Sequence, residues 1–548
     1  MSRQSWFRRL GASFSYVGLV VAALCFSASL SPSLLPRHYI VQGLLSGLAL
    51  AVGYGLGVLV VWLWCYLELR PPGAKIERVV KRLTTVGVAL VVLLALWRAT
   101  VWQNSIRELM EMQPLQSAYA PYVALIAVVF GAIVIGSARV FAKSCNLVDR
   151  QLKRLLPRRI SYVLSATVVG LILLTVANKL IAKQALIAAD AVFLEIDGLV
   201  DDGIEQPTDA RASGSAESLI AWDSIGRQGK DFIVTGPTAE QLKQFSGREA
   251  LRPLRVYVGL GSRDSEHERA QLALKELRRV GGFDRSVLVV ATPTGTGWLD
   301  PGAVDTLEFL HAGDTAIVSM QYSYLPSWIT ILVDPNRSRD SARILFDAIY
   351  GHWKTLPQDS RPRLYLHGLS LGALGSETCA DLFTLFEDPI QGGVFSGPPF
   401  PSTEWAAVTQ GRNPDSPAWL PTFRDGTMVR FTGKENSLDQ AGERWGPMRF
   451  VYVQHASDPM TFFAPELLLQ EPDWLAGKRG PDVSPYLRWY PIVTFLQIAF
   501  DLPMATSIPT GYGHNYAPAS YINAWIEVTE PAEWRAGDTE RLKQLFAE

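Results

Sequence analysis

The chain has 548 residues, of which 48% are hydrophobic, and a formal net charge of -1. This length exceeds one ordinary domain, so we expect at least two domains, each with its own core. The small net charge hides two halves of opposite sign: residues 1–189 hold 20 Lys/Arg and 5 Asp/Glu, whereas 31 of the 51 Lys/Arg and 47 of the 52 Asp/Glu follow them. The basic half is also the apolar half, which argues against nucleic-acid binding and indicates a membrane segment with cationic loops.

Five apolar stretches in the first 180 residues are free or nearly free of charge, over lengths close to the roughly 20 residues that cross a bilayer. They are residues 12–34, 40–64, 83–102, 120–138 and 160–177. The third is the weakest candidate, because Arg98 interrupts it and would have to reach an interface. The sequence therefore predicts an α-helical transmembrane bundle of about five helices, with four as the alternative.

The Lys/Arg content of the loops predicts the orientation of these spans. The N-terminus, the second loop and the fourth loop are basic, whereas the first loop offers only Arg37 beside His38. We therefore expect an integral membrane protein with a cytoplasmic N-terminus and, after an odd number of spans, an extracytoplasmic C-terminal part. The first stretch could also be a signal peptide, but the four apolar stretches after it favour a retained span.

The pattern changes after the last apolar stretch. Residues 201–218 are rich in Asp, Gly, Ser and Pro, which is typical of a surface loop or linker. From about residue 252, short β-branched or aromatic runs alternate with helical patterns at 266–280 and 341–353, as expected for a mostly parallel sheet flanked by helices. The predicted strands are residues 255–259, 286–291, 315–321, 363–367, 392–396, 428–431 and 450–454. We expect a transmembrane domain at 1–185, a connecting segment at 186–250 and a catalytic domain at 251–548.

The clearest local motif is Gly-Leu-Ser-Leu-Gly at 368–372, which lies between a predicted strand and a predicted helix at 373–386. This G-x-S-x-G pattern is typical of a nucleophile elbow, a strained turn that exposes a serine and needs small neighbours. Ser370 is the predicted nucleophile. The amide of Leu371, at the start of the helix, would donate to an oxyanion.

A serine nucleophile needs a histidine base and a carboxylate that orients the base. In folds with this elbow the acid and then the histidine follow the serine in the chain. Asp458 comes after a predicted strand, and His514 lies in a glycine-flanked loop, so we predict Ser370, Asp458 and His514 as a catalytic triad. His455 is an alternative base, although its place beside Asp458 favours a supporting role. Asp425, Asp439 and Asp473 are alternative acids without the position at a strand end.

A second oxyanion donor should follow an earlier strand. Thr294, Gly295 and Thr296 follow the strand at 286–291 and are the predicted donors, with the glycines of residues 259–261 as a weaker alternative. The glycine-rich stretch lacks the Gly-Lys-Ser/Thr ending of a phosphate-binding loop, and the scheme requires neither a metal nor a cofactor. The four cysteines have no Cys-x-x-Cys spacing and predict apolar fillers rather than a disulfide or a zinc site.

Four stretches together resemble the bacterial membrane-linked α/β-hydrolases, in which a multi-span N-terminal region precedes a hydrolase domain. They are residues 226–232, 291–298, 367–372 and 508–514. The resemblance covers most of the chain, and in the membrane part it consists of the pattern of spans. It implies an α/β-hydrolase fold and a triad, without a substrate.

We therefore expect a serine ester hydrolase or acyltransferase that acts through an acyl-enzyme in the bacterial cytoplasmic membrane. Its location favours a membrane lipid or lipid-linked ester as the substrate. The alternative is a non-catalytic membrane receptor or transport component with a degenerate hydrolase domain.

Overall fold

The computed structural model describes residues 14–69, 74–153, 157, 167, 169, 195–379, 388–442 and 444–547. Two compact units divide the chain. Unit 1 comprises residues 1–187, 464–475 and 481–504, and unit 2 comprises residues 188–463, 476–480 and 505–548. Most of the predicted fifth span at 160–177 lies outside the described residues.

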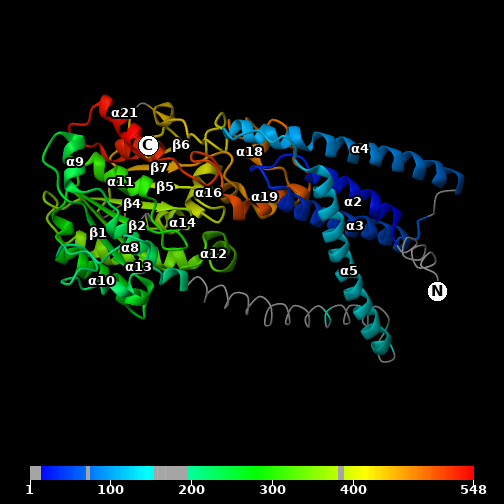
Figure 1. Cartoon of the computed structure of the whole chain (residues 1–548), viewed down its shortest axis with the longest axis horizontal. Coiled ribbons are helices and arrows are strands. Elements are labelled where there is room, and N and C mark those ends of the chain that lie inside the picture. The colour runs from blue at the N-terminus through cyan, green and yellow to red at the C-terminus, as the bar shows by residue number, and fades with distance from the viewer. Residues whose placement is uncertain are drawn as a thin grey trace. The chain divides into compact units, whose positions relative to one another are not determined.

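Long apolar helices dominate the N-terminal part of unit 1 (Figure 1). They are α2 (Tyr16–Ser29), α3 (Tyr39–Tyr66), α4 (Ala74–Leu109) and α5 (Ala120–Leu152). Helices α3, α4 and α5 are long and apolar enough to cross a membrane, which indicates membrane association. Helix α2 has only 14 residues, about 21 Å, so the predicted span at 12–34 is not one spanning helix in this structure.

Small residues allow these helices to approach closely. A Cβ atom on Gly57 of α3 would lie 2.6 Å from the Cα of Gly18 in α2. In lipid the hydrophobic effect does not drive apolar helices together, so such helices commonly associate through close backbone packing at small residues.

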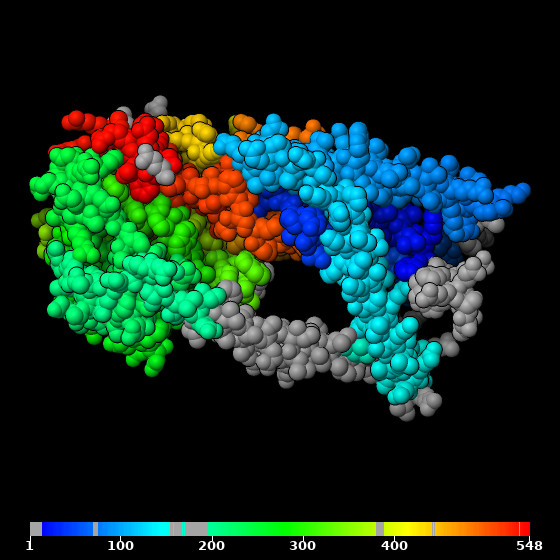
Figure 2. All heavy atoms as spheres, viewed as in Figure 1, coloured from blue at the N-terminus to red at the C-terminus, as the bar shows by residue number. Residues whose placement is uncertain are grey.

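Residues far along the chain complete unit 1. Helix α19 (Val493–Asp501) packs against α2 and α3, and Figure 2 shows its orange atoms against their blue ones. Residues 464–475 and 481–504 therefore belong with the N-terminal helices, although the sequence predicts one continuous catalytic domain at 251–548.

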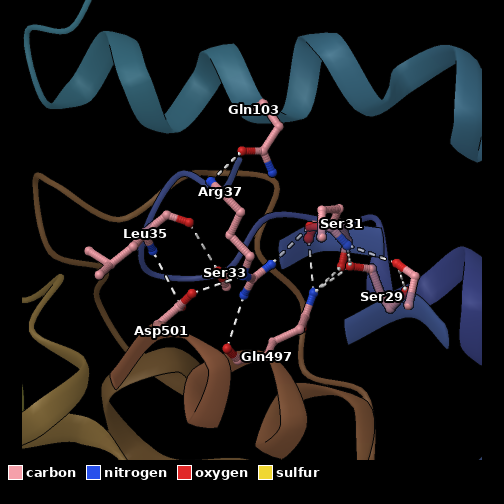
Figure 3. A network of polar contacts seen from close by, with 10 residues as sticks. Ser29, Ser31, Ser33, Leu35, Arg37, Gln103, Gln497 and Asp501 are labelled. Carbon is pink, nitrogen blue, oxygen red and sulfur yellow. Dashed lines mark hydrogen bonds and ion pairs between the residues drawn. The ribbon is translucent and has the colours of Figure 1, made fainter. Parts of the chain in front are cut away.

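A buried polar network holds α19 against the irregular loop 30–38 (Figure 3). Arg37 Nε donates to Asp501 Oδ1 at 2.9 Å, and both side chains are fully buried. Arg37 Nη2 donates to the carbonyl of Gln497 at 3.0 Å, and the Arg37 amide donates to Gln103 Oε1 at 2.9 Å. Gln497 Nε2 in turn donates to the carbonyl of Ser31 at 2.9 Å. Arg37, which the sequence analysis counts as the one Lys/Arg of the first loop, is therefore an internal residue.

Unit 2 is built on a seven-stranded, fully parallel sheet in the order β1-β3-β2-β4-β5-β7-β6. The strands are β1 (Leu254–Val258), β2 (Val287–Thr292), β3 (Thr315–Met320), β4 (Arg363–Leu369), β5 (Gly392–Ser396), β6 (Val429–Thr432) and β7 (Arg449–Val453). Almost every strand residue is buried, as expected when helices cover both faces of a parallel sheet. All seven predicted strands are confirmed to within two residues at each end.

Two groups of helices flank the sheet. Helices α10 (Glu266–Arg279), α13 (Asn336–Trp353) and α14 (Leu371–Glu377) pack on one another and on β1 to β4, while α11 (Pro301–Leu310) packs on α20 (Pro518–Thr529), which contacts β5 and β7. Among the described residues, unit 2 also contains α8 (Arg227–Val234), α9 (Ala239–Ser246), α12 (Ser327–Val333), α16 (Thr403–Gln410), α17 (Pro459–Phe462) and α21 (Ala536–Leu545). A short helix, α18 (Asp473–Ala476), lies where the chain passes from unit 1 to unit 2. Helix α8 packs on β1, so part of the predicted connecting segment 186–250 belongs to the core of unit 2. The three predicted domain boundaries otherwise stay predictions.

Candidate active site

Ser370 occupies a strained turn between β4 and α14. Its backbone has φ 59° and ψ -124°, a conformation that costs a non-glycine residue about 1–3 kcal/mol and needs support from its surroundings. A Cβ atom on Gly368 would lie 2.2 Å from the carbonyl carbon of Gly372, and one on Gly372 would lie 2.2 Å from the carbonyl oxygen of Thr292. Both motif glycines are therefore required by the geometry of this elbow.

Asp458 lies beyond the end of β7, where it forms the N-cap of α17. Its Oδ1 accepts from the Met460 amide at 2.8 Å, and its Oδ2 accepts from Thr461 Oγ1 at 3.2 Å. The same Oδ2 lies 2.7 Å from His514 Nδ1 and accepts from the Tyr516 hydroxyl at 2.7 Å. Burial alone would raise the pKa of Asp458, but the charge and hydrogen bond of His514, together with the other donors, lower it below its usual value.

The loop that carries His514 is fixed to the turn after β7. His455 Nδ1 lies 2.9 Å from the carbonyl oxygen of Gly513, and the Gly513 amide donates to Ser457 Oγ at 2.9 Å. The ring of His455 also stacks on Tyr516, with centroids 4.5 Å apart. These contacts hold the backbone of Gly513 before His514 and the ring of Tyr516 after it, while the imidazole of His514 faces Asp458.

Strand β5 connects the histidine to the serine. The Ser370 amide donates to the carbonyl of Ser396, the last residue of β5, at 2.9 Å. At the next residue, a Cβ atom on Gly397 would lie 2.5 Å from His514 Cε1. The imidazole of His514 therefore lies beside Gly397, and the residue before Gly397 is hydrogen-bonded to the backbone of Ser370.

The hydroxyl of Ser370 and the Nε2 atom of His514 are both buried in unit 2. Ser370 Oγ and His514 Nε2 have no hydrogen-bond partner among the residues that the structure describes. Catalytic hydrogen bonds are often long or misaligned before substrate binds, so two unpartnered atoms are compatible with a nucleophile and its base.

The loop after β2 lies against the elbow, and its amides are not equally available. The Thr294 amide donates to the carbonyl of Trp298 at 2.9 Å, and the Gly295 amide donates to Ser327 Oγ at 3.2 Å. No acceptor for the Thr296 amide occurs among the described residues. Leu371 is the first residue of α14, so its amide lacks an intrahelical acceptor. Of the four predicted oxyanion donors, the amides of Leu371 and Thr296 are therefore the two without an acceptor among the described residues.

Tyr516 is a site residue that the sequence does not single out, although its hydroxyl contacts the carboxylate of Asp458. The only signal is its place two residues after His514, which is too weak to distinguish one tyrosine of 18. In the described part of the chain, no group of three or more His, Cys, Asp or Glu side chains could hold a metal ion.

The parallel sheet with helices on both sides, and the serine elbow after β4, define the α/β-hydrolase fold class. A family model described as the alpha/beta-hydrolase family matches residues 254–542, and one described as the N-terminus of that family matches residues 30–237. The chain belongs to the alpha/beta-hydrolase family, because the first match covers more than half of it. No curated protein and no solved structure matches the chain.

Proposed function

We propose that this protein is a serine hydrolase or acyltransferase that cleaves a lipid or lipid-linked ester at the outer face of a bacterial cytoplasmic membrane. One observation carries the proposal: His514 Nδ1 lies 2.7 Å from Asp458, while His514 Nε2 and Ser370 Oγ are both buried and have no hydrogen-bond partner among the described residues. Family membership supports the coarser class of hydrolase.

In the proposed reaction, Ser370 Oγ attacks the ester carbonyl while His514 Nε2 takes the hydroxyl proton. Asp458 orients the imidazole and stabilises its cation, and the amides of Leu371 and Thr296 stabilise the oxyanion. The tetrahedral intermediate collapses, His514 protonates the leaving alcohol, and an acyl-serine remains. Water, or the hydroxyl of a second lipid, then attacks the acyl-serine, with His514 again taking the proton.

A fluorophosphonate probe tests this mechanism directly, because it forms a covalent bond only with an activated serine. We expect the full-length protein in detergent to be labelled, and Ser370→Ala to lose labelling completely. Asp458→Asn keeps the size of the side chain and should label about 10⁴-fold more slowly. Absence of labelling on folded wild-type protein would instead support the non-catalytic receptor or transport component.

The membrane location of the substrate rests on the three apolar helices α3, α4 and α5. The outward position of unit 2 rests on the charge pattern of the loops and on an odd number of spans. A reporter enzyme that is active only outside the cytoplasm, fused after Glu548, should be active in cells. An inactive fusion that is nevertheless produced would contradict this orientation.

A further inference from the structure

An open groove runs along the helices of unit 1. Its volume is about 820 Å³, within the range of small-molecule sites, and its walls come from α2, α4 and the segment that leads into α19. Leu24 and Ala28 line it on α2, Leu94 on α4, and Tyr490 and Val493 on the third wall. The walls are therefore mostly apolar and suit an acyl chain.

Arg98 of α4 is the one charged residue among those that line the groove. It is exposed, its guanidinium carbon lies 6.0 Å from the ring of Trp97, and no anionic partner for it occurs in the described part of unit 1. It is also the only charge in the apolar run 83–102. A guanidinium in such surroundings favours an anion, and its planar set of donors matches a phosphate.

Hydrogen bonds within unit 1 fix the third wall of the groove, which is the segment from Tyr490 to Val493. Gln497 Nε2 donates to the carbonyl of Ser31, which is itself a groove residue, and Asp501 anchors the end of α19 to Arg37 (Figure 3). The Tyr490 amide donates to Thr494 Oγ1 at 2.8 Å. A wall with these internal bonds exists before any ligand binds, which lowers the entropic cost of binding.

We propose that this groove is a binding site for an anionic phospholipid, with an acyl chain along the apolar walls and the phosphate on Arg98. No acidic side chain lines the groove to attract the ammonium group of a zwitterionic lipid. The site therefore discriminates by headgroup charge. This inference does not depend on Ser370 being a nucleophile.

The test uses full-length protein purified in mild detergent and mixed with equal amounts of phosphatidylglycerol and phosphatidylcholine. Lipid that remains bound after gel filtration is extracted and quantified by mass spectrometry. We expect wild type to bind more phosphatidylglycerol than phosphatidylcholine. In Arg98→Gln the ratio of bound phosphatidylglycerol to bound phosphatidylcholine should be about fivefold lower than in wild type. Arg150→Gln is the matched control, because Arg150 is an exposed cation of α5 outside the groove, and it should keep the wild-type ratio.

A second variant tests the apolar walls. Ala28→Trp fills the groove and should lower the bound amount of both lipids, and gel filtration shows whether the variant has folded. Equal enrichment in wild type and Arg98→Gln would overturn the proposal, as would unchanged lipid content in folded Ala28→Trp. Fluorophosphonate labelling of the same samples reports on Ser370 alone, so failure of the lipid site and failure of the proposed hydrolase are distinguishable.

Discussion

At the scale of single residues, the candidate site depends on glycines at positions where a side chain would collide with its neighbours. Gly397 has φ 51°, and the Cβ atom of an alanine there would lie 2.5 Å from His514 Cε1, which is too close for two carbon atoms. The imidazole would have to move, and so would its approach to the elbow. The absence of a side chain at position 397 therefore leaves the space that the His514 imidazole occupies.

We expect Gly397→Ala to lower the rate of fluorophosphonate labelling by at least about 100-fold, because a displacement of about 1 Å is enough to misalign a nucleophile and its base. Gly351→Ala is a suitable control. Gly351 lies in α13, and a Cβ atom added there would meet no other atom within 4 Å, so the change should leave labelling intact and stabilise the helix by up to about 1 kcal/mol. Equal labelling of both variants would show that Gly397 does not position His514.

The candidate triad could be proposed from the sequence because Ser370 and Asp458 each follow a recognisable strand, and because the restricted chain order leaves His514, in its glycine-flanked loop, as the base. The partners of these residues could not. The Tyr516 hydroxyl donates to Asp458, and the Gly295 amide donates to Ser327 Oγ. Both hydrogen bonds join segments that are separate in the sequence. Hydrogen bonds of that kind depend on where loops meet in space, and no local pattern of residues encodes them.

At the scale of elements, α14 follows the candidate nucleophile Ser370, which is its N-cap, and ends in a buried acid. Glu377, the last residue of this helix, accepts from the Trp405 amide and from the Tyr452 hydroxyl, each at 3.1 Å. Burial raises its pKa to about 7, against an ordinary value of 4.5. The folded state therefore holds this proton more tightly than the unfolded state does.

This linkage has a definite sign. A raised carboxyl pKa stabilises the fold fully below about pH 4.5, and that stabilisation is lost as the pH rises towards 7. Glu377→Gln keeps the acceptor oxygen and carries no titratable proton. Between pH 4.5 and pH 8 the free energy of unfolding of wild type should fall by about 3 kcal/mol relative to the variant. Urea unfolding at both pH values measures this difference, and parallel pH profiles would contradict the prediction.

The strands were predictable at this scale because a parallel sheet covered on both faces needs continuous apolar runs, and the chain has seven of them. The place of helix α19 in unit 1 was not predictable, because its apolar sequence suits a hydrolase domain equally well. Only its contacts with α2 and α3 reveal where it packs. The same reasoning applies to Arg37, which has the sequence setting of a loop charge: its partner, Asp501, lies 464 residues away.

At the scale of the whole molecule, that ion pair joins the two ends of unit 1. Removing one member leaves the other charge buried and uncompensated, which is more costly than removing both. We expect Arg37→Met to destabilise unit 1 by about 3–5 kcal/mol, and Arg37→Met with Asp501→Leu to recover most of this loss. Urea unfolding in detergent micelles would measure both changes. A double variant as unstable as the single one would show that the pair is not what holds α19.

The late position of α19 also determines when unit 1 can be finished during synthesis. Helices α2 to α5 leave the ribosome hundreds of residues before Asp501 does. The guanidinium of Arg37 therefore has no Asp501 carboxylate to bind until the elbow, β5 and β7 have been synthesised. The two units therefore cannot mature one after the other in the usual N-to-C order. A chain that begins after residue 187 would contain α19 without α2, α3 and Arg37, so the apolar face of α19 would lack its cover and Asp501 would lack its cation.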